Sequence, residues 1–135
     1  MNYMFKILHQ EEPDGTTYTR PMVTFLDSIT NSGKLAADII FHKDVDDIDN
    51  IIESLRAQIN SSIIEPYTWG YEIYSVICDG EYCRCHDNFS STPEKLADAE
   101  LILPTSEVLQ LMIDWRAFVV KWRVEYLGQD PALFV

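Results

Sequence analysis

Three cysteines and a histidine lie close together in the chain, in a pattern that could bind zinc. The run reads Cys78-x4-Cys83-x-Cys85-His86. It also contains Asp79-Gly80, a favoured two-residue hairpin turn. Pairing the strands about that turn places the three cysteines on one face of a sheet and the histidine on the other. Because a closed structural zinc site needs four ligands, we interpret the cysteines as reduced core residues and predict no metal.

Catalytic patterns are missing from the sequence. The three histidines are His9, His42 and His86, each at the end of a predicted strand, and none belongs to an HExxH motif. There is no GxSxG, Walker or GxGxxG motif either. Carboxylates are abundant, but abundance does not make an acid–base pair with separated pKa values. We therefore predict that the chain is not an enzyme and uses no cofactor.

The acidic residues are concentrated in one segment. Ten residues carry five acids and no base before Arg56; the acids are Asp44, Asp46, Asp47, Asp49 and Glu53. On a helix they span about 15 Å. Like charges this close repel one another by a few tenths of a kcal/mol per pair, although an anion in the first turn is favoured by the helix dipole. We interpret the segment either as a solvated, capped helix start or as a docking surface for a positively charged partner.

Overall composition narrows the classes of partner. The chain has 135 residues, 47% hydrophobic, with 22 acids against 10 bases and a net charge of −12. We expect one domain over residues 1–135. Such a charge repels phosphate, so we predict no binding of nucleic acid or of a membrane surface. The N-terminus does not resemble a signal peptide, and an odd, clustered set of cysteines is typical of a reducing compartment; we predict a cytoplasmic protein, either a monomer or a weak homodimer.

Periodicity predicts strands in the first third of the chain and then a helix. We expect strands over 3–9, 18–26 and 35–42, with a turn at Glu11-Glu12-Pro13-Asp14-Gly15. Pro21 cannot donate to a ladder and indicates an edge strand. Asp44 is a suitable N-cap for a helix over 45–60.

A predicted hairpin turn at Asp79-Gly80 separates two strands in the second half of the chain. We expect strands over 69–78 and 81–87, and a last strand over 100–103. Strict alternation puts an aromatic and basic set on the face away from the cysteines, where helices on one side of the sheet would leave it exposed. That face resembles an interface hot spot; the alternative is a second core layer or an oligomer contact. Its residues are Trp69, Tyr71, Ile73, Ile77, Tyr82, Arg84 and His86.

The last long helix has clear ends. Thr105 is the expected N-cap and Gly128 the expected stop, and apolar residues recur between them at helical spacing. The fold class is therefore α+β: an antiparallel sheet of about five to six strands with two helices packed on one face, in the order βββ-α-βββ-α.

The residues around the start of this helix resemble those of a known group. Leu101 to Leu109, followed by Asp114-Trp115-Arg116 and a further Trp122, resemble the closing segment of small bacterial immunity proteins. Those proteins accompany contact-dependent inhibition and other polymorphic toxins. The resemblance covers about 25 residues and implies a cytoplasmic inhibitor that binds the C-terminal domain of its cognate toxin.

Charge and resemblance together give our functional hypothesis. We expect an immunity protein that neutralises a basic toxin domain, such as a nuclease. The expected partner-binding residues are Asp46, Asp47, Asp49, Glu53, Tyr71, Tyr82 and Arg84. The alternative is an acidic mimic of nucleic acid, or another protein-binding adaptor.

Overall fold

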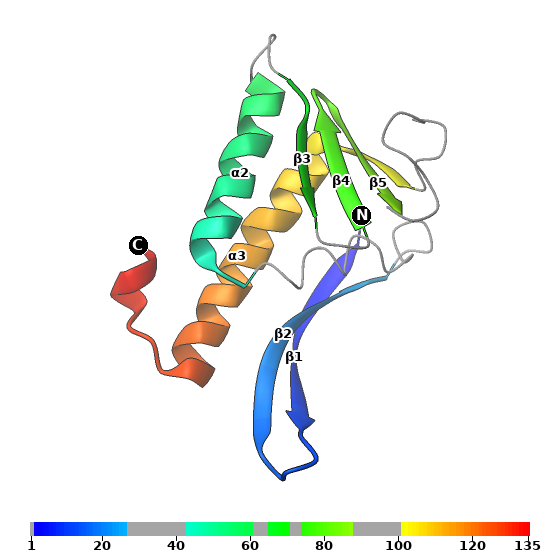
Figure 1. Cartoon of the computed structure of the whole chain (residues 1–135). Coiled ribbons are helices and arrows are strands. Elements are labelled where there is room, and N and C mark those ends of the chain that lie inside the picture. Colours follow the sequence, from blue (N-terminus) through cyan, green and yellow to red (C-terminus); the bar gives the residue numbers. More distant parts are fainter. Residues whose placement is uncertain (1, 27–42, 61–64, 71–73, 88–100) are drawn as a thin grey trace.

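The chain folds as an α+β protein, and its described residues form two long helices and two antiparallel sheets (Figure 1). The structure is a computed structural model and describes residues 2–26, 43–60, 65–70, 74–87 and 101–135. The strands are β1 (Tyr3–Glu11), β2 (Thr17–Phe25), β3 (Tyr67–Gly70), β4 (Tyr74–Asp79), β5 (Tyr82–Asp87) and β6 (Leu101–Pro104). The helices are α2 (Val45–Asn60), α3 (Thr105–Leu127) and the short 3-10 helix η2 (Pro131–Phe134).

The two helices lie side by side and link the two sheets. Helix α2 packs on β3 and β4, and α3 packs on β5 and β6. The β1–β2 hairpin packs against the second half of α3 and extends away from the four-stranded sheet in Figure 1. The α+β class and the two helices on one face of a sheet are therefore confirmed.

The predicted single sheet and the predicted element order are wrong. Strands β1 and β2 form their own two-stranded sheet, and the larger sheet has the order β3-β4-β5-β6. The expected strand over 69–78 is two strands, because β3 ends at Gly70, whose φ of 148° favours glycine. The strand expected over 35–42 lies outside the described residues.

The break at Gly70 also reverses the predicted facing of Trp69. Strand β3 pairs antiparallel with β4, so that Trp69 lies opposite Val76. Residues directly opposite each other point to the same face, and Trp69 is 6% exposed in the core beneath the helices. It therefore does not belong to the open face of the sheet.

Helix α2 starts and ends where the pattern predicts. The backbone N–H groups of Asp46 and Asp47 donate to Asp44 Oδ1, at 2.8 and 3.4 Å, which satisfies two of the free donors at a helix start. An apolar stripe then faces the core; its buried members are Val45, Ile48, Ile51, Ile52 and Leu55. Burial of such a stripe, more than local propensity, stabilises a helix of this length.

Helix α3 has the predicted end but a different start. Gly128 adopts the left-handed conformation (φ 67°) and its N–H donates to the Arg123 carbonyl, which closes the helix. Thr105 is the first helical residue and not the cap: its hydroxyl donates to the Gly80 carbonyl at 2.7 Å. Its backbone N–H donates to the Glu81 carbonyl, also at 2.7 Å. Thr105 therefore ties the start of α3 to the β4–β5 turn.

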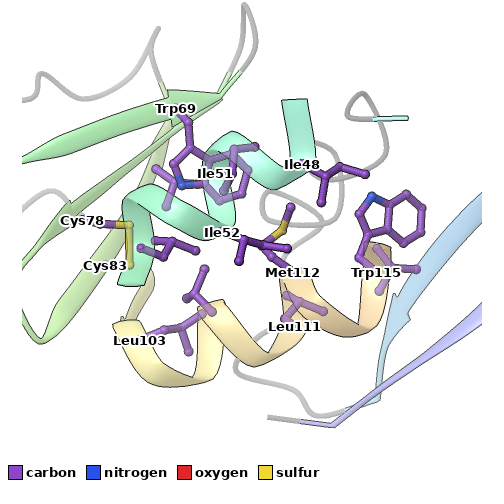
Figure 2. Close-up of a cluster of buried hydrophobic side chains, with 14 of the residues drawn as sticks. Ile48, Ile51, Ile52, Trp69, Cys78, Cys83, Leu103, Leu111, Met112 and Trp115 are labelled. Carbon is purple, nitrogen blue, oxygen red and sulfur yellow. A yellow bond between two sulfur atoms is a disulfide. The ribbon is translucent and has the colours of Figure 1, made fainter. Parts of the chain in front are cut away.

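The core runs between the helices and both sheets (Figure 2). Trp115 of α3 is completely buried and lies at the end near the hairpin. Its ring centroid is 5.6 Å from that of Phe5 on β1 and 6.3 Å from that of Phe118. This aromatic cluster is the main apolar contact between the hairpin and the helices.

The cysteines lie in the core, as predicted, but two of them are bonded. Cys78, Cys83 and Cys85 are all 0% exposed on the helix-facing side of the sheet. The two-residue turn is Gly80-Glu81 and not Asp79-Gly80, with Gly80 at φ 62° as a type II′ turn requires. The shift moves each pairing by two positions, which preserves the facing and sets Cys78 opposite Cys83. These two form a disulfide (Figure 2) and Cys85 lies outside it, so the prediction of three reduced cysteines is wrong.

This pairing predicts a simple thiol count. Protein purified without reductant and alkylated in denaturant is expected to carry one label per chain, on Cys85, and three labels after reduction. Mass spectrometry of the intact chain measures both numbers. Three labels before reduction would show that Cys78 and Cys83 are thiols in the folded protein.

Candidate functional site

The five acids of the α2 segment have three different environments. Asp44 caps the helix. Asp49 bonds to Arg116 of α3, with Nε–Oδ1 and Nη2–Oδ2 distances of 2.5 and 3.3 Å. Arg116 also donates to the Phe134 carbonyl at 3.2 Å, so one guanidinium joins α2, α3 and η2. The positive charge of Arg116 thus offsets the negative charge of Asp49, which was a predicted docking residue.

Asp46, Asp47 and Glu53 form the remaining acidic set, which we call the α2 acidic face. All three side chains are exposed, and none has an ion-pair partner within the described part of the chain. Asp46 and Glu53 lie on the outermost side of the helix by their spacing. Asp47 lies on the flank near β3. Burial raises the pKa of Tyr67, which lies on β3. A hydrogen bond with Ser54 lowers this pKa in part, and the negative charge of Asp47 raises it further.

The predicted aromatic and basic surface lies on the opposite side of the sheet. Tyr82 is 54% exposed, and Ile102, which lies opposite Arg84 on β6, is 56% exposed. Arg84 is less exposed and lies 3.6 Å from Asp79, measured from Nη2 to Oδ2. Tyr71 lies outside the described residues. Because α2 covers the other face of this sheet, one flat partner surface does not reach both Tyr82 and the α2 acidic face.

A buried glutamine, whose role was not predicted from the sequence, holds the C-terminal end of α2 in place. Gln58 of α2 is 4% exposed; its Nε2 donates to the Glu65 carbonyl at 2.7 Å and its Oε1 accepts from the Gly80 N–H at 2.8 Å. It fixes the end of α2 to the β4–β5 turn. Its burial could have been predicted from its position, because Gln58 follows Leu55 by three residues and so lies in line with the apolar stripe of α2.

A second missed contact joins the hairpin to α3. The Tyr3 hydroxyl donates to Asp114 Oδ2, and Gln110 Nε2 donates to Asp114 Oδ1 at 3.0 Å. Partial burial raises the pKa of Tyr3 well above its ordinary value, and the hydrogen bond and negative charge of Asp114 raise it further. These residues are 111 positions apart, so local patterns could not pair them.

Removing the Tyr3 hydroxyl should lower stability and change its dependence on pH. Tyr3→Phe is expected to cost about 1–2 kcal/mol at pH 7, because Asp114 loses a donor. A raised folded pKa stabilises the fold below the unfolded pKa of about 10, and this contribution is lost as the pH rises above it. Urea unfolding at pH 7 to 11 measures both effects. Tyr18→Phe, an exposed tyrosine of the same hairpin, is the control; equal curves for the two variants would contradict the contact.

The two histidines in described strands, His9 and His86, belong to different sheets. His9 on β1 packs edge-on against Tyr126, with 6.0 Å between ring centroids. His86 belongs to β5, in the other sheet, and His42 lies outside the described residues. Within the described ranges, no group of three or more His, Cys, Asp or Glu side chains could hold a metal ion.

Comparisons with protein-family models, curated proteins and solved structures find no match to this chain. No described helix combines the length and apolar character that a membrane span requires.

Proposed function

We propose that this chain is an immunity protein that binds and neutralises a basic bacterial toxin domain through the α2 acidic face. The observation that supports it best is that Asp46, Asp47 and Glu53 are exposed and have no ion-pair partner among the residues that the structure describes. Folding does not require this arrangement, because Asp44 already caps the helix and Asp49 already binds Arg116. Interspersed lysines would reduce the repulsion between the acids.

The proposed mechanism is occupation of a substrate cleft. A nuclease cleft presents cations to phosphate, and carboxylates on a rigid helix can bind the same cations. Complementary charge speeds encounter well above the neutral association rate of about 10⁵–10⁶ M⁻¹s⁻¹. The chain itself makes and breaks no bonds in this account and needs no cofactor.

The spacing of the free acids favours one specific partner over general mimicry of nucleic acid. Residues 46 to 53 rise about 10 Å along the helix axis. Three charges over that length are about half as dense as the charges of duplex DNA. Duplex DNA carries one phosphate charge per about 1.7 Å of helix axis when both strands are counted. A general mimic would need a longer and denser charged surface.

Several observations from the sequence support the same proposal. The start of α3 resembles small bacterial immunity proteins, and the net charge of −12 opposes nucleic acid and anionic membranes as direct partners. A cytoplasmic location is part of this proposal. It rests on the resemblance, because the Cys78–Cys83 bond removes the argument from reduced cysteines.

Growth protection tests this function. The toxin domain encoded beside this chain would be expressed alone and together with it. The wild-type chain is expected to restore growth. A chain that fails to protect, and fails to co-purify with the domain, would refute the proposal.

A further inference from the structure

A hollow in the described surface lies between the β1–β2 hairpin and the C-terminal end of α3. Its volume is about 620 Å³, and it is distinct from the α2 acidic face. We call it the hairpin groove. The residues that matter to the argument are His9, Glu11, Tyr18, Tyr126 and Leu127, all of which line it.

The walls of the hairpin groove are aromatic and accessible. Tyr18 is 43% exposed, Tyr126 45% and Leu127 47%. The edge-on contact with His9 helps to fix the Tyr126 ring. Exposed tyrosine faces attract cations through the negative face of the ring, and partly exposed aromatics next to apolar side chains are typical of interface hot spots.

Two independent features give the hairpin groove a negative electrostatic environment: acidic side chains and the C-terminal end of α3. Glu11 lines it, and Glu12 and Glu125 are exposed neighbours in the sequence. The last turn of α3 has no basic residue, so no side chain of that turn offsets the negative end of the helix dipole. The N–H groups of Gly128 and Gln129 both donate to the Arg123 carbonyl. In the described chain this leaves the carbonyls of residues 124–127 without a backbone donor.

We propose that the hairpin groove binds an arginine side chain of the partner. The guanidinium lies against Tyr126 and toward Glu11, and its aliphatic part lies against Leu127 and Tyr18. Arginine fits better than lysine because its planar group stacks on an aromatic ring while its five N–H donors reach carboxylate and carbonyl oxygens. This inference rests on the proposed function for the basic character of the partner, and it adds a second contact on a different part of the molecule.

A small probe tests the groove without the partner. Nα-acetyl-arginine methylamide and its neutral citrulline analogue would be titrated into the labelled chain, with amide shifts followed by NMR. Arginine is expected to shift residues 9–11, 17–19 and 126–127, and citrulline to bind about 5- to 20-fold more weakly, because it lacks the charge that the ring and the carboxylate attract. Equal binding of citrulline would assign the groove to a neutral ligand and overturn the proposal. Shifts spread over all acidic surfaces would overturn it as well.

Matched variants identify the contacts. Tyr126→Leu and Glu11→Gln should each weaken arginine binding about two- to fivefold. Tyr82→Leu and Glu107→Gln, exposed residues outside the groove, should leave it unchanged. Undiminished binding by both groove variants would refute the assignment. Arginine binding without growth protection would refute the proposed function and leave the groove standing; protection without arginine binding would do the reverse.

Discussion

Neutralising the α2 acidic face is expected to slow association with a basic toxin domain about 10- to 100-fold at low ionic strength. The variant is Asp46→Asn, Asp47→Asn and Glu53→Gln, which removes three charges and keeps the side-chain shapes. Steering by surface charge acts before contact, so the effect should appear mainly in the association rate. Stopped-flow mixing with a fluorescently labelled toxin domain measures that rate.

Salt and a matched variant separate local from overall charge. The difference between wild type and variant should shrink as salt rises, because the Debye length falls to about 8 Å at 0.15 M. The control is Glu65→Gln, Glu81→Gln and Glu107→Gln, which removes three exposed charges elsewhere. If both triple variants slow association equally, net charge and not the α2 acidic face controls encounter.

The second large effect concerns stability. Trp115→Ala is expected to cost about 3–5 kcal/mol, the range for loss of a buried aromatic side chain with its cavity. Trp115 is 0% exposed and contacts Phe5, so the variant also loosens the hairpin from α3. Urea unfolding followed by circular dichroism measures the loss.

The control for this substitution is Leu133→Ala. Leu133 is 70% exposed on η2, and a surface change of this kind stays within about 0.5 kcal/mol. A loss below about 1 kcal/mol for Trp115→Ala would contradict its complete burial in the core.

Both long helices could be predicted from the sequence because their signals are local. Apolar residues at helical spacing, with Asp44 before α2 and Gly128 after α3, determine the bounds that the structure has. The strand assignments depended on turns, and here one glycine was decisive. Without a turn at Gly70, alternation from Trp69 to Cys78 is continuous and puts Trp69 on the wrong face.

The register of the β4–β5 hairpin shows why facing is easier to predict than pairing. Moving the turn from Asp79-Gly80 to Gly80-Glu81 leaves the described side chains of β4 and β5 on their predicted faces. It changes only which residues are opposite, and that decides whether two cysteines can bond. Periodicity carries no information about this shift.

The candidate site was predicted as a segment but not in its internal roles. The Asp49–Arg116 pair spans 67 positions, and no local pattern relates them. Three consecutive residues of α3 likewise make long-range contacts: Asp114 binds Tyr3, Trp115 fills the core and Arg116 binds Asp49. These residues hold the fold together, whereas the exposed residues of α2 are the ones available to a partner.

The most direct test of the central claim is a titration of toxin activity. The purified chain would be added in steps to the purified toxin domain while cleavage of its nucleic-acid substrate is followed. The account predicts that activity falls linearly to zero at one chain per toxin. Cleavage that continues unchanged in the presence of excess chain would contradict it.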